Sequence, residues 1–227
     1  GTRGENPNGR ITLVVASKPG VYALERAAKA GVEGCVVRRK DYASSEDFDA
    51  ALLKTLKDHN IDLVVLAGFL SVLGPSVIEA YPRRILNVHP ALIPSFCGPG
   101  MYGLRPHEAA LARGCKVTGA TVHFVNEECD GGPILLQKAV DILPGDTPEV
   151  LQKRVMEQAE WKLLPKAVAM VCSGEIEKEI NWLALSGRFA SSSPKGRALG
   201  KTMNFVWTAK ASHFGGGGSA SALTKRA

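Results

Sequence analysis

Asn87 and His89 are the two residues whose types and spacing best suit chemistry, and they lie within the stretch ILNVHPALIP at residues 85–94. An apolar, strand-like run ends here, and Pro90 stops regular structure directly after the histidine. Residues two apart on a strand point to the same face. The sequence therefore predicts an amide and an imidazole side by side at the end of a buried strand.

Asp130 is the third candidate, in the turn sequence NEECDGGP. Transfer of an acyl or formyl group to an amine needs an amide N–H or an imidazolium to stabilise the tetrahedral oxygen, and a group that titrates near neutral pH to move the proton. A carboxylate beside the imidazole raises its pKa and orients it. If the fold brings Asp130 to Asn87 and His89, the three residues suit this reaction. Taken alone, they are equally compatible with ordinary turn and loop chemistry.

The elements before this site alternate between strand and helix patterns. Short β-branched or apolar runs predict strands at residues 11–17, 35–39, 62–68 and 84–88. Apolar residues at helical spacing predict helices at residues 21–31, 44–60 and 75–81. This alternation predicts an α/β fold with a mostly parallel, Rossmann-like open sheet and helices on both faces. Ligands bind such sheets beyond the carboxyl ends of the strands, which is where Asn87 and His89 fall.

The residues after Pro90 predict a different arrangement. A glycine- and proline-rich loop at residues 95–106 leads into a helix at 107–114. Two strands follow, at 116–125 and 134–140, and we expect them to form a C-terminal antiparallel pair. A long helical stretch from 148 to 174 begins after a Thr147 cap, and its internal Pro165 is expected to kink or restart it.

The chain divides into three parts by composition. Residues 1–10 form a ragged polar start, and residues 11–185 form one domain. Residues 186–227 are rich in glycine, serine and isolated basic residues, so we expect them to be disordered, although the FVW run at 205–207 can adhere locally. The run GGGGSASA at 215–222 resembles a flexible linker.

The basic charge of the chain is concentrated in its last part. The net charge is +6, but residues 188–227 hold seven basic and no acidic side chains. The remaining 187 residues carry 21 basic against 22 acidic side chains and are close to neutral. A specific nucleic-acid surface over the domain is therefore not expected.

Apolar runs and cysteines favour a cytoplasmic protein without a metal. The longest apolar stretch, residues 63–74, is shorter than the ~20 residues of a membrane span, and no secretion signal opens the chain. The five cysteines are scattered without C-x-x-C spacing, so we expect reduced thiols rather than disulfides or a zinc site. Nothing in the sequence indicates an oligomeric state.

Four blocks of sequence then point to one family. LAGFL at 66–70, RILNVHPALIP at 84–94, KVTGATVHFVNEECDGGPILLQKAV at 116–140 and PGDTPEVLQKRV at 144–155 occur in this order. Together they closely resemble the folate-dependent glycinamide ribonucleotide formyltransferase family of purine biosynthesis, over about residues 10–178. The resemblance implies the formyltransferase fold and two small-molecule partners. It implies formyl transfer from 10-formyltetrahydrofolate, as cosubstrate, to the amine of glycinamide ribonucleotide, with no metal.

The resemblance also assigns roles to individual residues. His89 would be the proton donor, Asp130 the group that raises its pKa, and Asn87 the third catalytic residue. Glu160 would hold the substrate ribose, unless it is only part of a solvated helix face. His107 and His123 fall near the family's cleft and receive no catalytic role. The folate-binding residues would be Leu70, Ser71, Val72, Leu73, Asn87, Asn126, Glu127, Glu128, Cys129 and Asp130, of which the aliphatic ones can equally be plain core.

Two departures from the family pattern affect these expectations. The family pattern begins one βα unit earlier, with a glycine-rich loop whose amides hold the substrate phosphate. Here the polar start leads directly into the family's second strand, so we expect a truncated domain that lacks a central strand and the phosphate site. The loop CGPGMYGLRP at 97–106 is also longer than in the common bacterial form.

Three alternatives to this activity remain open at this point. Formyltetrahydrofolate hydrolases and methionyl-tRNA formyltransferases share the fold. The hydrolases usually have an NIHHS-like motif where this chain has NVHPA, and both relatives carry a further domain. The third alternative is a non-catalytic fragment that binds folate, which the expected loss of the phosphate loop favours.

Overall fold

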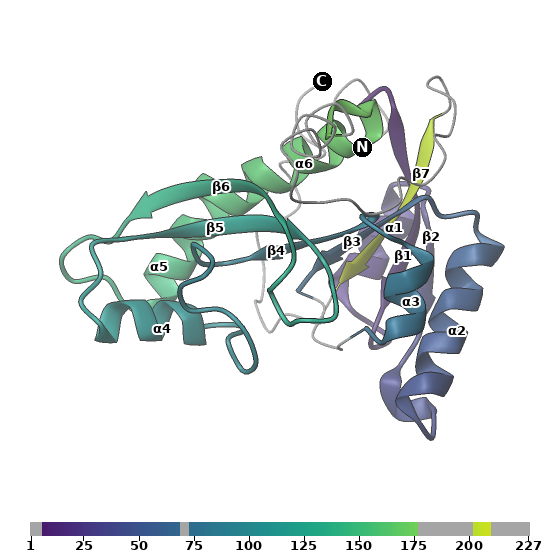
Figure 1. The fold of residues 1–227 in the computed structure, drawn as a ribbon, viewed down its shortest axis with the longest axis horizontal. Helices are drawn as coiled ribbons and strands as arrows, with labels where there is room; N and C mark the ends of the chain where they lie inside the picture. The colour runs from purple at the N-terminus through teal and green to yellow at the C-terminus, as the bar shows by residue number, and fades with distance from the viewer. Residues whose placement is uncertain (1–5, 69–72, 177–201, 210–227) are drawn as a thin grey trace, which may run out of the picture.

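A seven-stranded sheet organises the fold (Figure 1). The computed structural model describes residues 6–68, 73–176 and 202–209. The strands are β1 Gly9–Ala16, β2 Glu33–Val36, β3 Leu63–Ala67, β4 Ile85–His89, β5 Val117–Phe124, β6 Ile134–Asp141 and β7 Met203–Ala209. Their order across the sheet is β2-β1-β7-β3-β4-β5-β6.

The sheet has a parallel part and an antiparallel part. Strands β2, β1, β7, β3 and β4 pair in parallel, whereas β5 pairs antiparallel with β4 and β6 antiparallel with β5. The predicted mostly parallel open sheet with a C-terminal antiparallel pair is therefore confirmed.

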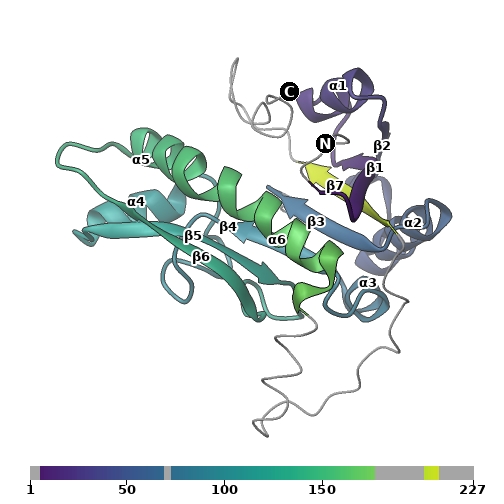
Figure 2. The same cartoon turned by 90° about the horizontal axis from the view of Figure 1, so that it is seen from above.

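Helices cover both faces of the sheet, as predicted. They are α1 Tyr22–Lys29, α2 Ser45–Asp58, α3 Pro75–Ala80, α4 Arg105–Ala112, α5 Pro148–Val155 and α6 Trp161–Ser173. A 3₁₀ turn, η1 Arg39–Asp41, and a π-helical turn, η2 Met156–Glu160, complete the set of described elements. Figure 2 shows α5 and α6 running along one face, with α2 and α3 beyond the other.

Alternation along the strands separates two hydrophobic cores. Val65 of β3 packs in the core that lies under α5 and α6, whereas its neighbours Val64 and Leu66 pack in the core under α2 and α3. Each buried valine or leucine side chain contributes about 1.5–3 kcal/mol through removal of apolar surface from water. Because alternating residues of each strand are buried in one core or the other, the orientation of the side chains at the strand ends is fixed as well.

Local capping explains where two of the helices begin. The Ser44 hydroxyl accepts the N–H of Asp47 at the start of α2, and the Thr147 hydroxyl accepts the N–H of Val150 at the start of α5. The long predicted helix is interrupted at η2, and Pro165 lies inside α6 rather than at the break. Because a proline clashes with the carbonyl four residues before it, the adjustment falls ahead of Pro165.

The main difference from the sequence-based expectation is β7. Residues 203–209 were expected to be irregular, and the sheet was expected to lack a central strand. Instead β7 pairs in parallel with β1 on one side and β3 on the other, so the central position of the described sheet is filled. The rest of the segment from 186 onward lies outside the described residues. Within the described part of the chain, no helix has the length and apolarity needed to cross a bilayer.

Candidate active site

Strands β4 and β5 bring two imidazoles and an amide together. In their antiparallel register Asn87 lies directly opposite His123, and His89 opposite Thr121. Because side chains alternate between the faces of a strand, Asn87 and His89 share one face with His123. His89 is 4% exposed and His123 is 1% exposed. The structure therefore places Asn87 and His89 at the end of a strand, as predicted.

Asp130 reaches this cluster from a tight turn between β5 and β6. Its own φ of 56° is left-handed, a conformation that aspartate adopts more readily than most residues. Gly132 follows, and a Cβ at this position would lie 1.8 Å from the carbonyl oxygen of Phe124. Only glycine fits so close an approach. The DGG sequence thus aims the Asp130 carboxylate back toward the end of β4.

The Asp130 carboxylate lies at the centre of the site. Its Oδ2 atom is 3.4 Å from His89 Nδ1 and accepts the N–H of Gly98 at 2.9 Å. Its Oδ1 atom lies 3.5 Å from His123 Nε2 and accepts from Asn87 Nδ2 at 3.4 Å. The structure thus brings the predicted residues Asn87, His89 and Asp130 into one polar cluster.

Both ring nitrogens of His89 face acceptors. Nε2 lies 2.8 Å from the carbonyl oxygen of Phe96, whereas Nδ1 faces the Asp130 carboxylate. A neutral ring has a single N–H, and the shorter contact assigns it to Nε2. The Nδ1 lone pair then faces the carboxylate, so a proton taken up at Nδ1 satisfies both contacts at once. The geometry suits a ring that takes up and releases a proton at Nδ1.

Asn87 directs both of its amide hydrogens into the cluster. Its Nδ2 atom lies 3.1 Å from His123 Nε2 as well as 3.4 Å from Asp130 Oδ1. His123 donates from Nδ1 to the carbonyl oxygen of Phe124 at 2.9 Å, so its Nε2 lone pair is free to accept from Asn87. In this arrangement the amide can donate to a new ligand only by releasing one of these two contacts.

Burial and charge shift the pKa values of the cluster in opposite ways. Burial lowers the pKa of His89 below its ordinary value, and the Asp130 carboxylate and the Phe96 carbonyl offset only part of that effect. The predicted influence of Asp130 on His89 is present, but burial outweighs it. Burial also opposes ionisation of Asp130, yet the hydrogen bond from the Gly98 N–H and the neighbouring imidazoles of His123 and His89 keep its pKa below the ordinary value. Asp130 is therefore an anion near neutral pH.

Three contributors were not predicted from the sequence. They are the His123 ring, the Phe96 carbonyl and the Gly98 amide, and the last two come from the glycine-rich loop after β4. His123 lies opposite Asn87 through the pairing of β4 with β5, and the sequence alone does not fix the register of these two strands. No sequence pattern identifies backbone groups of a loop as partners.

His107 lies near the cluster but makes no hydrogen bond. Its side chain on α4 is fully buried, and neither ring nitrogen has a partner within the described residues. Burial and repulsion from His89 lower its pKa to about 4. His107 is therefore a neutral ring near pH 7.

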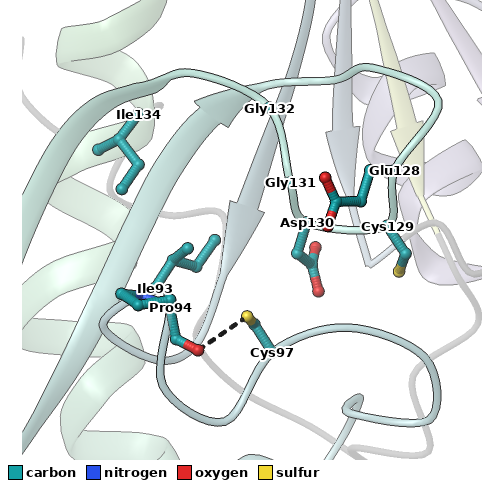
Figure 3. Close-up of a pocket in the computed structure, with 9 residues that line it drawn as sticks. All are labelled: Ile93, Pro94, Cys97, Glu128, Cys129, Asp130, Gly131, Gly132 and Ile134. Atoms are coloured by element: carbon teal, nitrogen blue, oxygen red, sulfur yellow. Dashed lines mark hydrogen bonds between the residues drawn. The ribbon is translucent and has the colours of Figure 1, made fainter.

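A cavity of about 430 Å³ opens beside Asp130 (Figure 3). This volume lies within the ~300–1,000 Å³ of typical small-molecule sites. Its lining residues are Ile93, Pro94, Cys97, Glu128, Cys129, Asp130, Gly131, Gly132 and Ile134. Three of the predicted folate-binding residues, Glu128, Cys129 and Asp130, are among them. Two others, Asn126 and Glu127, are exposed on the same turn but do not line the cavity.

The second predicted folate segment is only partly described. Leu70, Ser71 and Val72 lie outside the described residues. Leu73 is 6% exposed and belongs to the core under α2 and α3, which agrees with the plainer expectation of core packing.

Glu160 lies apart from the cluster in the described contacts. It ends the π-helical turn η2, which packs against β5 and β6, and its side chain is half-buried. Burial raises the pKa of Glu160 to about 7. The carboxylate is thus partly withdrawn from solvent, and its predicted contact with a ribose stays a prediction.

Thiols and metal ligands add no further site. All five cysteines are free thiols, and burial raises the pKa of Cys97 and Cys129 beside the cavity, so both are protonated near neutral pH. Within residues 6–68, 73–176 and 202–209, no three His, Cys, Asp or Glu side chains form a group that could hold a metal ion.

Comparison with known proteins shows that the chain is similar to formyltransferases. The family model described as formyl transferase matches residues 1–168, so the chain has the fold of the formyltransferase class. A crystal structure of glycinamide ribonucleotide transformylase 1 from Symbiobacterium toebii superposes with a TM-score of 0.68 at 40% identity, covering 73% of this chain and 76% of that one. The chain belongs to the phosphoribosylglycinamide formyltransferase family.

Curated relatives give the same result. The chloroplastic phosphoribosylglycinamide formyltransferase of Arabidopsis thaliana is 39% identical over 176 residues, which are 77% of this chain and 59% of that protein. The trifunctional purine biosynthetic protein adenosine-3 of Gallus gallus is 41% identical over 167 residues, 74% of this chain but 16% of the relative. The chain thus spans less than two thirds of either curated relative.

Proposed function

We propose that this chain transfers the formyl group of 10-formyltetrahydrofolate to the amine of 5'-phosphoribosylglycinamide in de novo purine (IMP) biosynthesis. The observation that carries the proposal is the shared carboxylate: His89 and Asn87 both contact Asp130 at the carboxyl end of β4. The names of the relatives supply the substrate class. The thiols on the chain agree with a reducing compartment such as the cytoplasm.

The reaction requires movement of protons but no change in oxidation state. The amine nitrogen attacks the formyl carbon and forms the new C–N bond, which gives a tetrahedral intermediate with a negatively charged oxygen. Collapse of this intermediate breaks the bond between the carbon and N10 of the folate. One proton leaves the attacking amine and one reaches N10, so the products are the formylated amine and tetrahydrofolate.

His89 is suited to the proton-transfer role in this sequence. Its Nδ1 atom faces Asp130 and its Nε2 atom is held by Phe96, so the ring is oriented from both sides. An imidazolium formed here stabilises the oxyanion and donates to the leaving nitrogen. Asp130 balances the charge of that imidazolium, while Asn87 turns one N–H from the cluster to the oxyanion.

The cavity beside Asp130 is the proposed place for part of the folate. Apolar side chains of Ile93, Pro94 and Ile134 line one side, and the turn that carries Glu128 and Cys129 lines the other. Flat aromatic cosubstrates bind in such partly apolar sites and are oriented by a few polar groups. Asn126 and Glu127 would contribute from the same turn, and Glu160 would hold the ribose of the second substrate.

An amine-dependent assay tests the proposal. The purified chain is incubated with 10-formyltetrahydrofolate with and without 5'-phosphoribosylglycinamide, and release of tetrahydrofolate is followed. We expect turnover that requires the amine and falls by about 10²–10⁴-fold in His89→Ala. His59→Ala is the matched control, since His59 lies on the surface between Thr55 and Glu33 and should retain activity.

The other outcomes identify the alternatives. Turnover that does not need the amine would identify a formyltetrahydrofolate hydrolase. Formylation of methionyl-tRNA in place of the ribonucleotide would identify the tRNA enzyme. Folate binding without turnover on any of these substrates would identify a non-catalytic folate-binding protein.

A further inference from the structure

His123 occupies an irregular position in strand β5. The pairing of β5 with β6 shifts its register between Val122 and His123. Irregularities of this kind redirect a side chain and are frequent beside active sites. On the other side of β5, His123 lies opposite Asn87 of β4. The irregularity therefore falls at the residue that faces the amide of the site.

The contacts of the His123 ring define its tautomer. Its Nδ1 atom lies 2.9 Å from the carbonyl oxygen of Phe124, and a carbonyl oxygen can only accept. Nδ1 therefore carries the proton, and Nε2 of the neutral ring presents a lone pair. The Asp130 carboxylate is 3.5 Å from Nε2, too far to hold a proton there instead. Asn87 Nδ2, at 3.1 Å, donates to the Nε2 lone pair.

The contact with His123 decides which end of the Asn87 amide faces the cluster. An asparagine side chain keeps nearly the same shape when its oxygen and nitrogen are exchanged, so its hydrogen bonds distinguish the two orientations. In the exchanged orientation Asn87 Oδ1 would face two acceptors, the His123 lone pair and the Asp130 carboxylate. In the observed orientation Nδ2 lies 3.1 Å from His123 and 3.4 Å from Asp130, so the imidazole makes the shorter contact.

His123 and Asn87 differ in their access to a ligand. His123 is 1% exposed, so its ring is closed off from a substrate. Asn87 is half-buried, so part of its side chain remains open to a ligand. Both N–H groups of an amide lie in one plane. Because His123 holds one of them, the direction of the other is fixed, and this second N–H has only the longer contact with Asp130 to release.

We propose that His123 is a positioning residue for Asn87: its Nε2 lone pair holds the amide so that the second N–H can turn to the oxyanion. This inference rests on the proposed function and deepens it, because it assigns the group that orients the catalytic amide. In this role His123 makes no bond to a substrate and exchanges no proton. Its effect on the reaction is exerted through Asn87 alone.

A double-mutant cycle tests whether His123 acts through Asn87. His123→Leu removes the acceptor, and we expect kcat and kcat/KM to fall together by at least about tenfold, since loss of one oxyanion donor costs about 10²–10³-fold. In the Asn87→Ala background the same substitution should cost less than about twofold, because the group that His123 positions is already absent. Equal losses in the two backgrounds would overturn the proposal.

Two further variants separate positioning from folding. His123→Gln keeps an acceptor oxygen near the place of Nε2, so we expect it to restore most of the kcat that His123→Leu loses. Thr118→Val is the matched control, because Thr118 is a buried polar residue at the other end of β5, and it should leave kcat unchanged. A kcat of His123→Gln no higher than that of His123→Leu contradicts a role as acceptor.

A measurement on the unmodified chain keeps the proposal testable if the His123 variants unfold. Long-range proton–nitrogen NMR correlation identifies the protonated nitrogen of each imidazole. We expect His123 to carry its proton on Nδ1, and we expect Asn87→Ala to shift the Nε2 resonance toward the value of a free lone pair. A proton on Nε2, or an Nε2 resonance that does not respond to Asn87→Ala, overturns the proposal.

Amine-dependent formyl transfer judges the proposed function separately. Transfer by a chain whose His123 carries its proton on Nε2 overturns only the role of His123. Absence of transfer together with the expected NMR result overturns only the activity, and the orientation of Asn87 by His123 stands.

Discussion

The antiparallel part of the sheet and its centre are assembled in different ways. In the antiparallel part, the partners of the site come from β4, β5 and the turns beside them, and Asn87 lies 36 positions from His123. At the centre, β7 brings together segments from opposite ends of the chain: Arg10 donates to Asn204 across 194 positions, and Thr208 to Val65 across 143.

This difference teaches where chemistry and stability reside in the molecule. The antiparallel part holds buried polar side chains that hydrogen-bond to one another, and these are the groups suited to catalysis. The centre holds apolar side chains that pack alternately in the two hydrophobic cores, so its main contribution is to stability. Substitutions in the first region should alter the reaction and leave the fold, and substitutions in the second should do the reverse.

The largest effect is expected at the centre of the sheet. Val206→Asp places a carboxylate in a fully buried position without a partner, so we expect the free energy of unfolding to fall by about 4 kcal/mol or more. Urea denaturation followed by circular dichroism measures it. Val36→Asp in the edge strand β2 is the matched control, because Val36 is 39% exposed. Equal stability of the two variants would show that β7 is dispensable.

The next effect concerns the carboxylate at the centre of the site. Asp130→Asn keeps the shape but removes the charge that favours an imidazolium at His89, so we expect formyl transfer to fall by about 10²-fold and the pKa of His89 to fall further. Assays of turnover and NMR titration of the His89 ring measure the two changes. Asp58→Asn, which removes a surface ion pair with Lys54, should change neither. A raised pKa of His89 would contradict the assigned role.

A smaller effect is expected from the turn that aims Asp130. Gly132→Ala places a methyl group against the Phe124 carbonyl, so the turn must move, and we expect a loss of about 2–3 kcal/mol in stability together with reduced turnover. In the control Gly34→Ala the added methyl meets the end of the flexible Leu24 side chain. Thermal melts and assays on both variants separate the effects; equal activities would mean that the turn does not position Asp130.

The smallest effect concerns Glu160, outside both regions. Because burial raises the pKa of Glu160 from 4.5 to about 7 in the folded state, the folded protein loses stability as pH rises from about 4.5 to 7 and loses no more above that range. Glu160→Gln should therefore match the unmodified chain at pH 4 and exceed it by roughly 1–2 kcal/mol at pH 8. Urea unfolding at both pH values measures this. A gain that is larger at pH 4 would show that the carboxylate is stabilised when charged.

Much of the fold and the centre of the site could be predicted from the sequence. Most strands before β7 have clear apolar or β-branched runs, although β2 begins at Glu33 rather than at the predicted Cys35. Asn87 and His89 interrupt an apolar run, and Asp130 stands in a glycine-containing turn. His123 was missed as a partner because its contact depends on strand register, and the Phe96 carbonyl because backbone groups have no signature. The predicted effect of Asp130 on the pKa of His89 is present, but the larger effect of burial could not be predicted because burial of a strand end cannot be measured from sequence.

The central strand could not be predicted for a different reason. Seven residues, MNFVWTA, follow a long polar stretch, and no local pattern tells where such a short run will pair. Only the open position between β1 and β3, flanked by Leu13, Val15, Val64 and Val65, defines its place. Tertiary packing against residues far away in the sequence, rather than local strand propensity, determines where this strand forms.

The late position of β7 along the chain has a consequence for synthesis. Strands β1 and β3 emerge from the ribosome early, and each presents an unpaired inner edge until residues 203–209 have been made. Unpaired edges of this kind invite association with other chains, and domains usually fold as complete units. The sheet can therefore close cooperatively only after β7, the last of its described strands in chain order, has been made.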